Sequence, residues 1–431
     1  MKRTITRRRM LQTSAAAGAG FWLGTAAASR AADSPNEKLR IACIGIGGQG
    51  RFSVNGTAKS ENIVALCDVD DERAGDAYGK FPQAKRFTDF RRMFDAMEKG
   101  IDAVTVATPD HTHYHAALWA LRRGKHVYLE KPLAHNVWEV RELTNLAAEK
   151  KLATQLGAQR HAIGGLRAGV EIAKSGVLGE ISEVHCWIGG DRGMPKIPTD
   201  KQAAPSHLDW DLWLGPAKER AYHPTYCPYG WRFWWDFGTG ETGNWGCHIL
   251  DIPFWALDLK LPTKVEASGP PVHEETTSKA MHAKFEFPAS DKRGPVALHW
   301  YHTKSDPPAL AERGLKGGGF NTCFIGSKGV LWCGFGGWKL TPEKDFAGYE
   351  APKTFPASPG FHKEWLNAIR GGGPATCNWG YSGPLTETVL LGNVAYRAGE
   401  AFEWDAAGLK TVGSAKAQGL IREEYRKGWE T

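Results

Sequence analysis

Short apolar runs alternate with helical stretches along the first part of the chain. The apolar runs cover residues 39–46, 63–68, 103–108 and 127–129. Stretches with helical character lie at residues 50–59, 70–81, 113–123 and 138–151. This alternation predicts an α/β domain built on a parallel, doubly wound sheet of the Rossmann type. A last apolar strand at residues 152–156 is expected to close this domain, whose predicted bounds are 33–156.

The pattern changes after residue 157. A helical stretch at 164–176 leads into a strand at 181–188, and residues 191–237 are rich in proline, glycine and tryptophan. Alternating stretches typical of strands then cover residues 264–269, 280–287, 296–302, 322–325 and 329–333. We therefore predict a C-terminal α+β domain over residues 157–431 with a mostly antiparallel, open sheet. Its last helix, at 382–401, is expected to return to the first domain.

The first thirty residues have the pattern of an export signal. The stretch Thr6-Arg7-Arg8-Arg9-Met10 precedes a small and apolar run at 14–28. An arginine pair before such a run is typical of a twin-arginine (Tat) signal, and the run is short for a membrane span. We predict that residues 1–32 are a signal peptide, that the protein is periplasmic, and that no stable membrane insertion remains after cleavage.

Most of the net positive charge lies in this segment. The chain carries a formal charge of +7, and residues 1–31 contain six lysines and arginines but no acidic residue. The remainder is close to neutral and has no basic stripe, so no nucleic-acid partner is expected. The eight cysteines show neither a C-x-x-C pair nor a zinc spacing with histidine. We therefore predict no metal site.

A glycine fingerprint follows the first strand. Gly45 permits the tight turn, Gly47 lets the backbone approach a pyrophosphate, and Gly50 lets the following helix pack closely. Asp68 ends the second strand, where it can bind ribose hydroxyls. Val69 comes next, rather than a residue that would welcome a phosphate. The prediction is an NAD site, and NADP stays open because Arg51 and Arg73 are nearby in the sequence.

Glu130-Lys131-Pro132 ends the apolar run at 125–129. A buried lysine beside a positive nicotinamide ring has a destabilised ammonium group, so it can exchange a proton near neutral pH. Hydride transfer from an alcohol requires such a group. A surface Glu-Lys-Pro turn is the alternative, but the position after an apolar strand favours a reactive lysine.

Four motifs together resemble the glucose-fructose oxidoreductase, inositol dehydrogenase and MocA (Gfo/Idh/MocA) family. They are Gly-Ile-Gly-Gly-Gln-Gly at 45–50, Ala-Thr-Pro-Asp-His-Thr-His at 107–113, Gly-Lys-His-Val-Tyr-Leu-Glu-Lys-Pro at 124–132 and Gly-Asn-Trp-Gly-Cys-His-Ile-Leu-Asp at 243–251. The resemblance covers nearly the whole chain after the signal. It implies that Lys131 is the catalytic lysine, that His248 is the acid-base residue, and that the peptide before Pro132 is cis.

Motifs and resemblance together predict the cofactor site. Its residues are Gly45, Gly47, Gly48, Gln49, Gly50, Asp68, Thr108, Pro109, His113, Glu130 and Lys131.

The chain departs from the family pattern at Asn244. In inositol dehydrogenase and its nearer relatives an aspartate stands four residues before the catalytic histidine. Asn244, His248 and Asp251 share one face if residues 244–251 form a helix, so they could still converge. Without the aspartate's charge the imidazolium is less favoured. The predicted catalytic residues are Lys131, His248 and Asn244, and a core histidine is the alternative for His248.

The predicted substrate contacts are one arginine after the last Rossmann strand and several residues near the tryptophans. Stacking of sugar C–H faces on indole rings would explain this aromatic composition. Trp213 and Trp255 are expected to be core residues. The predicted substrate-binding residues are Arg160, Asp191, Arg232, Trp235 and Asp251.

These features predict an exported NAD(P)-dependent oxidoreductase that transfers hydride between nicotinamide and a secondary alcohol of a carbohydrate or polyol. The resemblance also implies a homo-oligomer. One alternative is an NAD-dependent glycosidase or epimerase that oxidises a ring carbon transiently. Another is a non-catalytic carbohydrate-binding protein, for which Asn244 is the best support.

Overall fold

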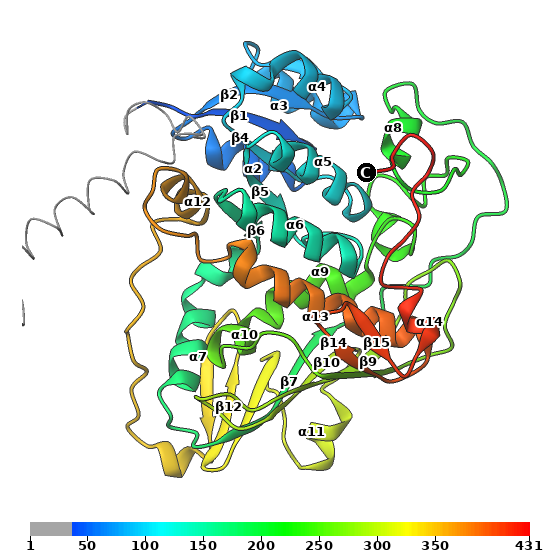
Figure 1. Cartoon of the computed structure of the whole chain (residues 1–431). Helices are drawn as coiled ribbons and strands as arrows, with labels where there is room; N and C mark the ends of the chain where they lie inside the picture. The colour runs from blue at the N-terminus through cyan, green and yellow to red at the C-terminus, as the bar shows by residue number, and fades with distance from the viewer. Residues whose placement is uncertain (1–36) are drawn as a thin grey trace, which may run out of the picture. The chain divides into compact units, whose positions relative to one another are not determined.

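Six parallel strands form the first sheet, in the order β3-β2-β1-β4-β5-β6 (Figure 1). The computed structural model describes residues 37–431, so the predicted signal, residues 1–32, lies outside the described residues. The strands of this sheet are β1 (Arg40–Ile44), β2 (Asn62–Cys67), β3 (Lys85–Phe87), β4 (Ala103–Val106), β5 (His126–Glu130) and β6 (Thr154–Gly157). Strands β4 and β5 are buried throughout, as in parallel sheets covered on both faces. The predicted Rossmann sheet is confirmed.

One helix connects each strand to the next. These helices are α2 (Gly50–Thr57), α3 (Asp71–Lys80), α4 (Phe90–Met97), α5 (Asp110–Arg122) and α6 (Val137–Glu149). The prediction missed β3 and α4. Strand β3 is a three-residue edge strand with two exposed residues, so its apolar pattern is weak. Helix α4 buries Phe90, Met93 and Phe94 at helical spacing, a pattern that the sequence did contain.

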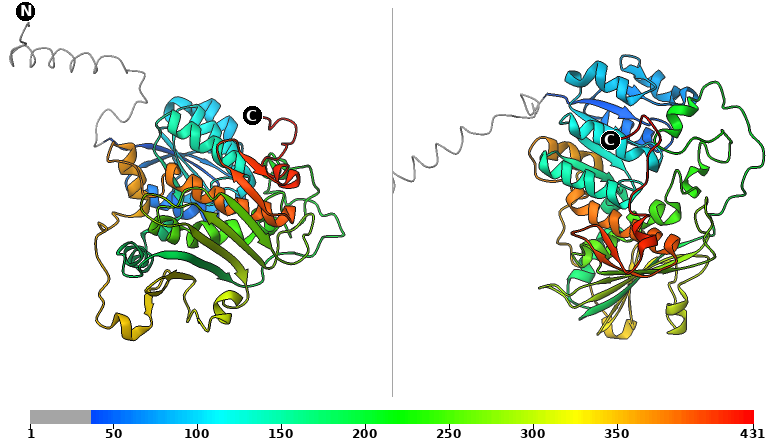
Figure 2. Two further views of the ribbon diagram at one scale, coloured as in Figure 1. Left: turned by 60° about the horizontal axis from the view of Figure 1, so that its bottom comes forward. Right: turned by 45° about the vertical axis from the view of Figure 1, so that its right-hand side comes forward.

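The second sheet has nine strands, in the order β13-β12-β11-β7-β10-β9-β8-β14-β15 (Figure 2). Strands β7 and β10 are parallel and every other pair is antiparallel, which confirms the predicted sheet type. The prediction missed β13, β14 and β15, each of which has four residues or fewer. The strands are β7 (Ile181–Gly189), β8 (Lys264–Ser268), β9 (Met281–Phe287), β10 (Val296–Thr303), β11 (Thr322–Gly326), β12 (Gly329–Cys333), β13 (Trp338–Thr341), β14 (Phe402–Asp405) and β15 (Lys410–Val412).

The helices of the second part lie mostly between or beside the two sheets (Figure 1). Helix α13 contacts α6 of the first part and strands β8 and β9 of the second sheet. It spans 379–398 rather than the predicted 382–401. These helices are α7 (Gly164–Lys174), α8 (Trp210–Leu214), α9 (Gly240–Ile249), α10 (Asp251–Ala256), α11 (Pro308–Glu312), α12 (Phe361–Ile369), α13 (Trp379–Ala398) and α14 (Ala415–Gln418).

The C-terminal segment also returns to the Rossmann part. The backbone N–H of Trp138 donates to the Ile421 carbonyl at 3.0 Å, and the Tyr425 hydroxyl donates to Glu139 at 2.9 Å. All eight cysteines are buried and unpaired. No helix in residues 37–431 combines the length and the apolar character that crossing a membrane requires.

Candidate active site

A cavity of about 590 Å³ lies at the carboxyl ends of the Rossmann strands, where α/β proteins of this kind bind ligands. Loops after β1, β2, β4 and β5 form one wall. Segments from the second part of the chain form the other. The lining residues that concern the predicted site are Gly45, Gly47, Gly48, Gln49, Asp68, Thr108, Pro109, Glu130, Lys131, Arg160, Arg192, Tyr229, Arg232, Asn244, Trp245 and His248.

The glycine fingerprint forms the turn that the sequence predicts. Gly45 has φ +72°, and a Cβ added there would lie 2.7 Å from the Ala107 carbonyl carbon. A Cβ on Gly50 would lie 1.9 Å from the Gly45 carbonyl oxygen, because α2 begins directly against the turn. No larger residue fits at either position. The residues present therefore fit a dinucleotide whose phosphates approach the start of α2.

Asp68 lies at the edge of this turn. One carboxylate oxygen accepts hydrogen bonds from the backbone N–H groups of Ile46 at 2.7 Å and Gly47 at 3.1 Å. Burial raises the pKa of this carboxyl group although those hydrogen bonds oppose the shift. Arg73 lines the same end of the cavity, whereas Arg51 is paired with Asp76 at 2.7 Å and does not line it.

His113 lies behind the cavity wall rather than in it. Its ring is buried between two carbonyl oxygens, that of Pro132 at 2.7 Å from Nδ1 and that of Thr108 at 2.8 Å from Nε2. Burial lowers the pKa of His113. His113 therefore holds the Thr108 loop from behind, whereas the prediction placed it among the residues that line the nicotinamide end. Thr108 and Pro109 do line the cavity.

Lys131 joins the two halves of the cleft. Its peptide bond to Pro132 is cis, as the resemblance implied. The ammonium group donates a hydrogen bond to Oδ1 of Asn244 on α9 at 2.9 Å. Burial lowers the pKa of Lys131, and the neighbouring carboxylate of Glu130 opposes this shift. Burial also raises the pKa of Glu130 to about 7.

His248 lies one helical turn after Asn244 on α9 and lines the cavity. Its Nδ1 is buried without a hydrogen-bond partner among the described residues. Burial lowers the pKa of His248 well below its ordinary value, and the positive charges of Lys131 and Arg160 lower it further. The imidazole is therefore neutral near pH 7 and can accept a proton.

Three predicted substrate contacts do not line the cavity. Helix α9 ends at Ile249 and α10 begins at Asp251, so the single helix assumed for residues 244–251 is broken. Asp251 is fully buried and bonded to His161 at 2.9 Å and to the Tyr381 hydroxyl. Asp251 therefore lies outside the cavity in which the prediction placed it.

Trp235 and Asp191 also lie outside the cavity, each for a different reason. Trp235 is buried, and its indole N–H donates to the His273 carbonyl at 3.2 Å. Asp191 is exposed on the loop after β7 and paired with Lys304 at 2.7 Å. Both predictions rested on closeness in sequence to the tryptophan-rich segment.

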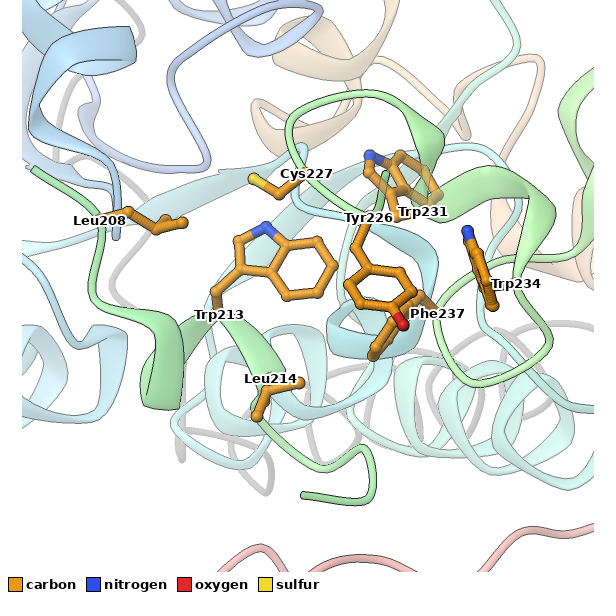
Figure 3. Close-up of a cluster of buried hydrophobic side chains, with 8 residues drawn as sticks. All are labelled: Leu208, Trp213, Leu214, Tyr226, Cys227, Trp231, Trp234 and Phe237. Atoms are coloured by element: carbon orange, nitrogen blue, oxygen red, sulfur yellow. The ribbon is translucent and has the colours of Figure 1, made fainter. Parts of the chain in front are cut away.

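Much of that aromatic segment forms a core cluster (Figure 3). Trp213 is buried there, as expected, and its ring centroid lies 5.0 Å from that of Phe237. Trp255 is only partly buried and stacks between His161 and Phe355. The prediction missed Trp245, which follows Asn244 on α9 and lines the cavity.

Two clusters of metal-ligand side chains occur among the described residues. They are His161, Asp251 and Cys377, and Glu183, His185 and His299. Neither cluster lines the cleft. In the second cluster, the carboxylate of Glu183 also accepts hydrogen bonds from Arg313 at 2.8 and 3.1 Å. The expectation that the protein binds no metal stays a prediction.

Two family models match the chain. Residues 39–158 match the NAD-binding Rossmann fold of the Gfo/Idh/MocA oxidoreductase family, and residues 184–292 match its C-terminal alpha/beta domain. The chain belongs to this family. Its first part is thus the NAD-binding domain of a Gfo/Idh/MocA oxidoreductase.

Two curated relatives are similar over part of their length. A UDP-N-acetylglucosamine 3-dehydrogenase of Acidithiobacillus ferrooxidans is 29% identical over 119 residues, which are 28% of this chain and 36% of that protein. A glycosyl hydrolase family 109 protein of Solibacter usitatus is 31% identical over 176 residues, 37% of this chain and 38% of that protein. The matched segments therefore span little more than a third of each relative.

The fold is shared over a greater length with proteins of known structure. The WlbA dehydrogenase of Bordetella pertussis, solved with NADH and UDP-GlcNAcA, superposes with a TM-score of 0.60 at 16% identity. The match covers 85% of this chain and 99% of that one. At this identity it shows the common fold.

Proposed function

We propose that the protein is an exported NAD-dependent dehydrogenase acting on a secondary alcohol of a sugar, a polyol or a derivative. The observation that carries the proposal is the meeting of Lys131 and Asn244 beside His248 in the cleft. The similarity to a UDP-N-acetylglucosamine 3-dehydrogenase supports a sugar derivative as substrate.

Lys131 on one wall of the cavity and His248 on the other have different roles in the reaction. NAD, when bound, supplies the hydride acceptor. The Lys131 ammonium stabilises the negative charge that develops on the substrate oxygen, and Asn244 orients the ammonium through their 2.9 Å hydrogen bond. The neutral imidazole of His248 takes the hydroxyl proton. Burial lowers the pKa of both groups, and for His248 this keeps the imidazole unprotonated, the form that can accept the proton.

Steady-state kinetics test this assignment. Lys131→Met and His248→Ala should each lower kcat/KM by about a hundredfold to ten-thousandfold, because each removes a positioned acid-base group. The substrate would first be found by following nicotinamide absorbance with a panel of sugars and polyols. NAD affinity and thermal unfolding should stay near those of the parent. Lys174→Met, which changes a lysine paired with Asp258 outside the cleft, is the matched control. Normal turnover by His248→Ala would contradict the assignment.

The similarity to a glycosyl hydrolase family 109 protein favours one second candidate, an NAD-dependent glycosidase. The same side chains would then move the protons while NAD oxidises a ring carbon, the leaving group is eliminated, water is added, and the NADH formed reduces the ring carbon again. Release of nitrophenol from nitrophenyl glycosides, with no net change in nicotinamide absorbance, would identify this reaction. Net formation of NADH would identify the dehydrogenase.

Export is proposed from residues 1–32 alone. Arg7 and Arg8 form the pair that a twin-arginine receptor recognises, and the fold begins further along the chain. Replacing both by lysine should leave folded, NAD-binding protein in the cytoplasm. Cell fractionation of the parent and the double variant measures this. Equal export of the two proteins would exclude the twin-arginine route.

A further inference from the structure

Positive charge gathers at the substrate end of the cleft. Arg160, Arg192 and Arg232 line the cavity together with Lys131 and His248. The positive charge of Arg232 lowers the pKa of Lys131, and the positive charge of Arg160 lowers the pKa of His248. Arg232 and Arg160 thus lie on the side of the cavity that holds the catalytic pair.

Arg160 and Arg232 have no carboxylate partner within ion-pair distance among the described residues, although each is partly buried. Aromatic rings hold them instead. The Arg160 guanidinium carbon lies 4.4 Å from the Phe335 ring centroid and 5.1 Å from that of Trp245. Such stacking fixes a guanidinium group while leaving its N–H edge available.

Arg232 is held in the same way. Its guanidinium carbon lies 4.2 Å from the Trp231 ring centroid and 4.4 Å from that of Tyr229, and one N–H donates to the Tyr229 carbonyl at 3.1 Å. Burial lowers the pKa of Arg232, so its charge is partly desolvated. A partly buried cation without a counter-ion is costly unless a ligand supplies one.

The acids nearby are already engaged. Glu241 pairs with Arg192 at 2.7 Å. Asp110 is buried and accepts hydrogen bonds from the backbone N–H of Thr239 at 3.1 Å and its hydroxyl at 2.6 Å. Neither carboxylate lies within ion-pair distance of Arg160 or Arg232.

We propose that the substrate carries an anionic group, a carboxylate or a phosphate, which the guanidinium groups of Arg160 and Arg232 bind. Guanidinium groups donate paired N–H bonds to both kinds of anion. The inference rests on the proposed function, since it names the class of substrate for that reaction. Binding of the anion should also affect His248. The positive charge of Arg160 lowers the pKa of His248, and a bound anion beside Arg160 would offset that charge. Anionic substrates should therefore strengthen His248 as a base.

Calorimetry on the full chain saturated with NAD tests the proposal. The probes are three stereochemical series, gluco, galacto and manno, each comprising a neutral hexose, its hexuronate and its 6-phosphate. At least one charged member should bind about tenfold or more tightly than its neutral parent, as expected for charge-assisted hydrogen bonds. A preference for hexuronates would indicate a carboxylate, and a preference for 6-phosphates would indicate a phosphate.

Arg160→Gln and Arg232→Gln should each remove about tenfold or more of that preference, taken as the ratio of charged to neutral affinity measured on the same variant. The matched control is Arg167→Gln, because Arg167 stacks similarly on Trp255 and Phe355 outside the cleft. The proposal is overturned if no charged member binds more tightly than its parent in any series, or if the arginine variants lose NAD instead. Failure of hydride transfer, with the anion preference intact, would count only against the proposed reaction.

Discussion

Asn244 places a neutral amide beside the Lys131 ammonium, one helical turn before His248. Its amide oxygen accepts the Lys131 hydrogen bond, and a carboxylate at this place would face both Lys131 and His248. Asn244→Asp should raise the pKa of both groups, because a nearby anion favours their charged forms. Since His248 acts when neutral, the acidic limb of the kcat/KM profile should move to higher pH. Measuring kcat/KM against pH for this variant and for exposed Asn55→Asp checks the direction. An unchanged acidic limb would show that His248 does not set it.

Asp68 links the fingerprint turn to the predicted ribose site. Asp68→Ala should weaken NAD binding by about 1.5 to 3 kcal/mol, because hydrogen bonds to a charged group are lost. It also leaves the N–H groups of Ile46 and Gly47 without their acceptor. Calorimetry on protein stripped of nucleotide measures the change. Asp71→Ala, at an exposed position in the first turn of α3, is the control. Equal NAD affinity in the Asp68 variant would refute the ribose assignment.

At the scale of one element, α2 depends on the absence of a side chain at its first residue. Gly50→Ala should displace the helix from the turn, because the new methyl group would overlap the Gly45 carbonyl oxygen. NAD binding and thermal stability should both fall. Gly79→Ala offers the contrast: it lies inside α3 with open space around the added Cβ and should stabilise the protein by about 0.5–1 kcal/mol. Thermal unfolding compares the two variants. A Gly50→Ala protein that is stable and binds NAD would show that the turn can move to accommodate a methyl group.

The break between α9 and α10 shows where element prediction reaches its limit. A continuous helical face would place Asp251 beside His248, yet the first helix ends at Ile249. Asp251 instead accepts hydrogen bonds from His161 and Tyr381, which are distant in sequence. Local spacing could not reveal these partners, because they come from separate elements brought together by packing.

At the scale of the whole molecule, α6 and α13 are joined by a buried ion pair. Arg141 donates to Glu387 at 2.8 Å, and the Trp404 indole N–H donates to the same carboxylate at 3.0 Å. Arg141→Leu should destabilise the protein by about 3–5 kcal/mol, because it leaves Glu387 buried without its counter-ion. Lys174→Ala, which breaks an exposed pair, should cost about 1 kcal/mol or less.

The stability lost in Arg141→Leu should depend on pH. Burial already raises the pKa of Glu387, and removing Arg141 raises it further. A carboxyl group whose pKa is higher in the folded than in the unfolded protein stabilises the fold fully at pH values below its unfolded-state pKa. This contribution is lost as pH rises through its folded-state pKa. The deficit of Arg141→Leu should therefore be greater at about pH 8 than at about pH 5, as measured by urea unfolding. An equal deficit at both values would mean that Glu387 does not carry the charge.

The sequence by itself determined the features that depend on local sterics and short spacing. The roles of Gly45 and Gly50, the alternation of strands and helices in the Rossmann part and the place of Lys131 directly after a strand all follow from residues close together in the chain. Tertiary structure alone decided which polar and aromatic residues face the cleft. Trp235 and Asp251 are buried away from it, while Trp245 lines it. Burial and hydrogen-bond partners depend on segments far apart in sequence, so only their packing could separate these residues.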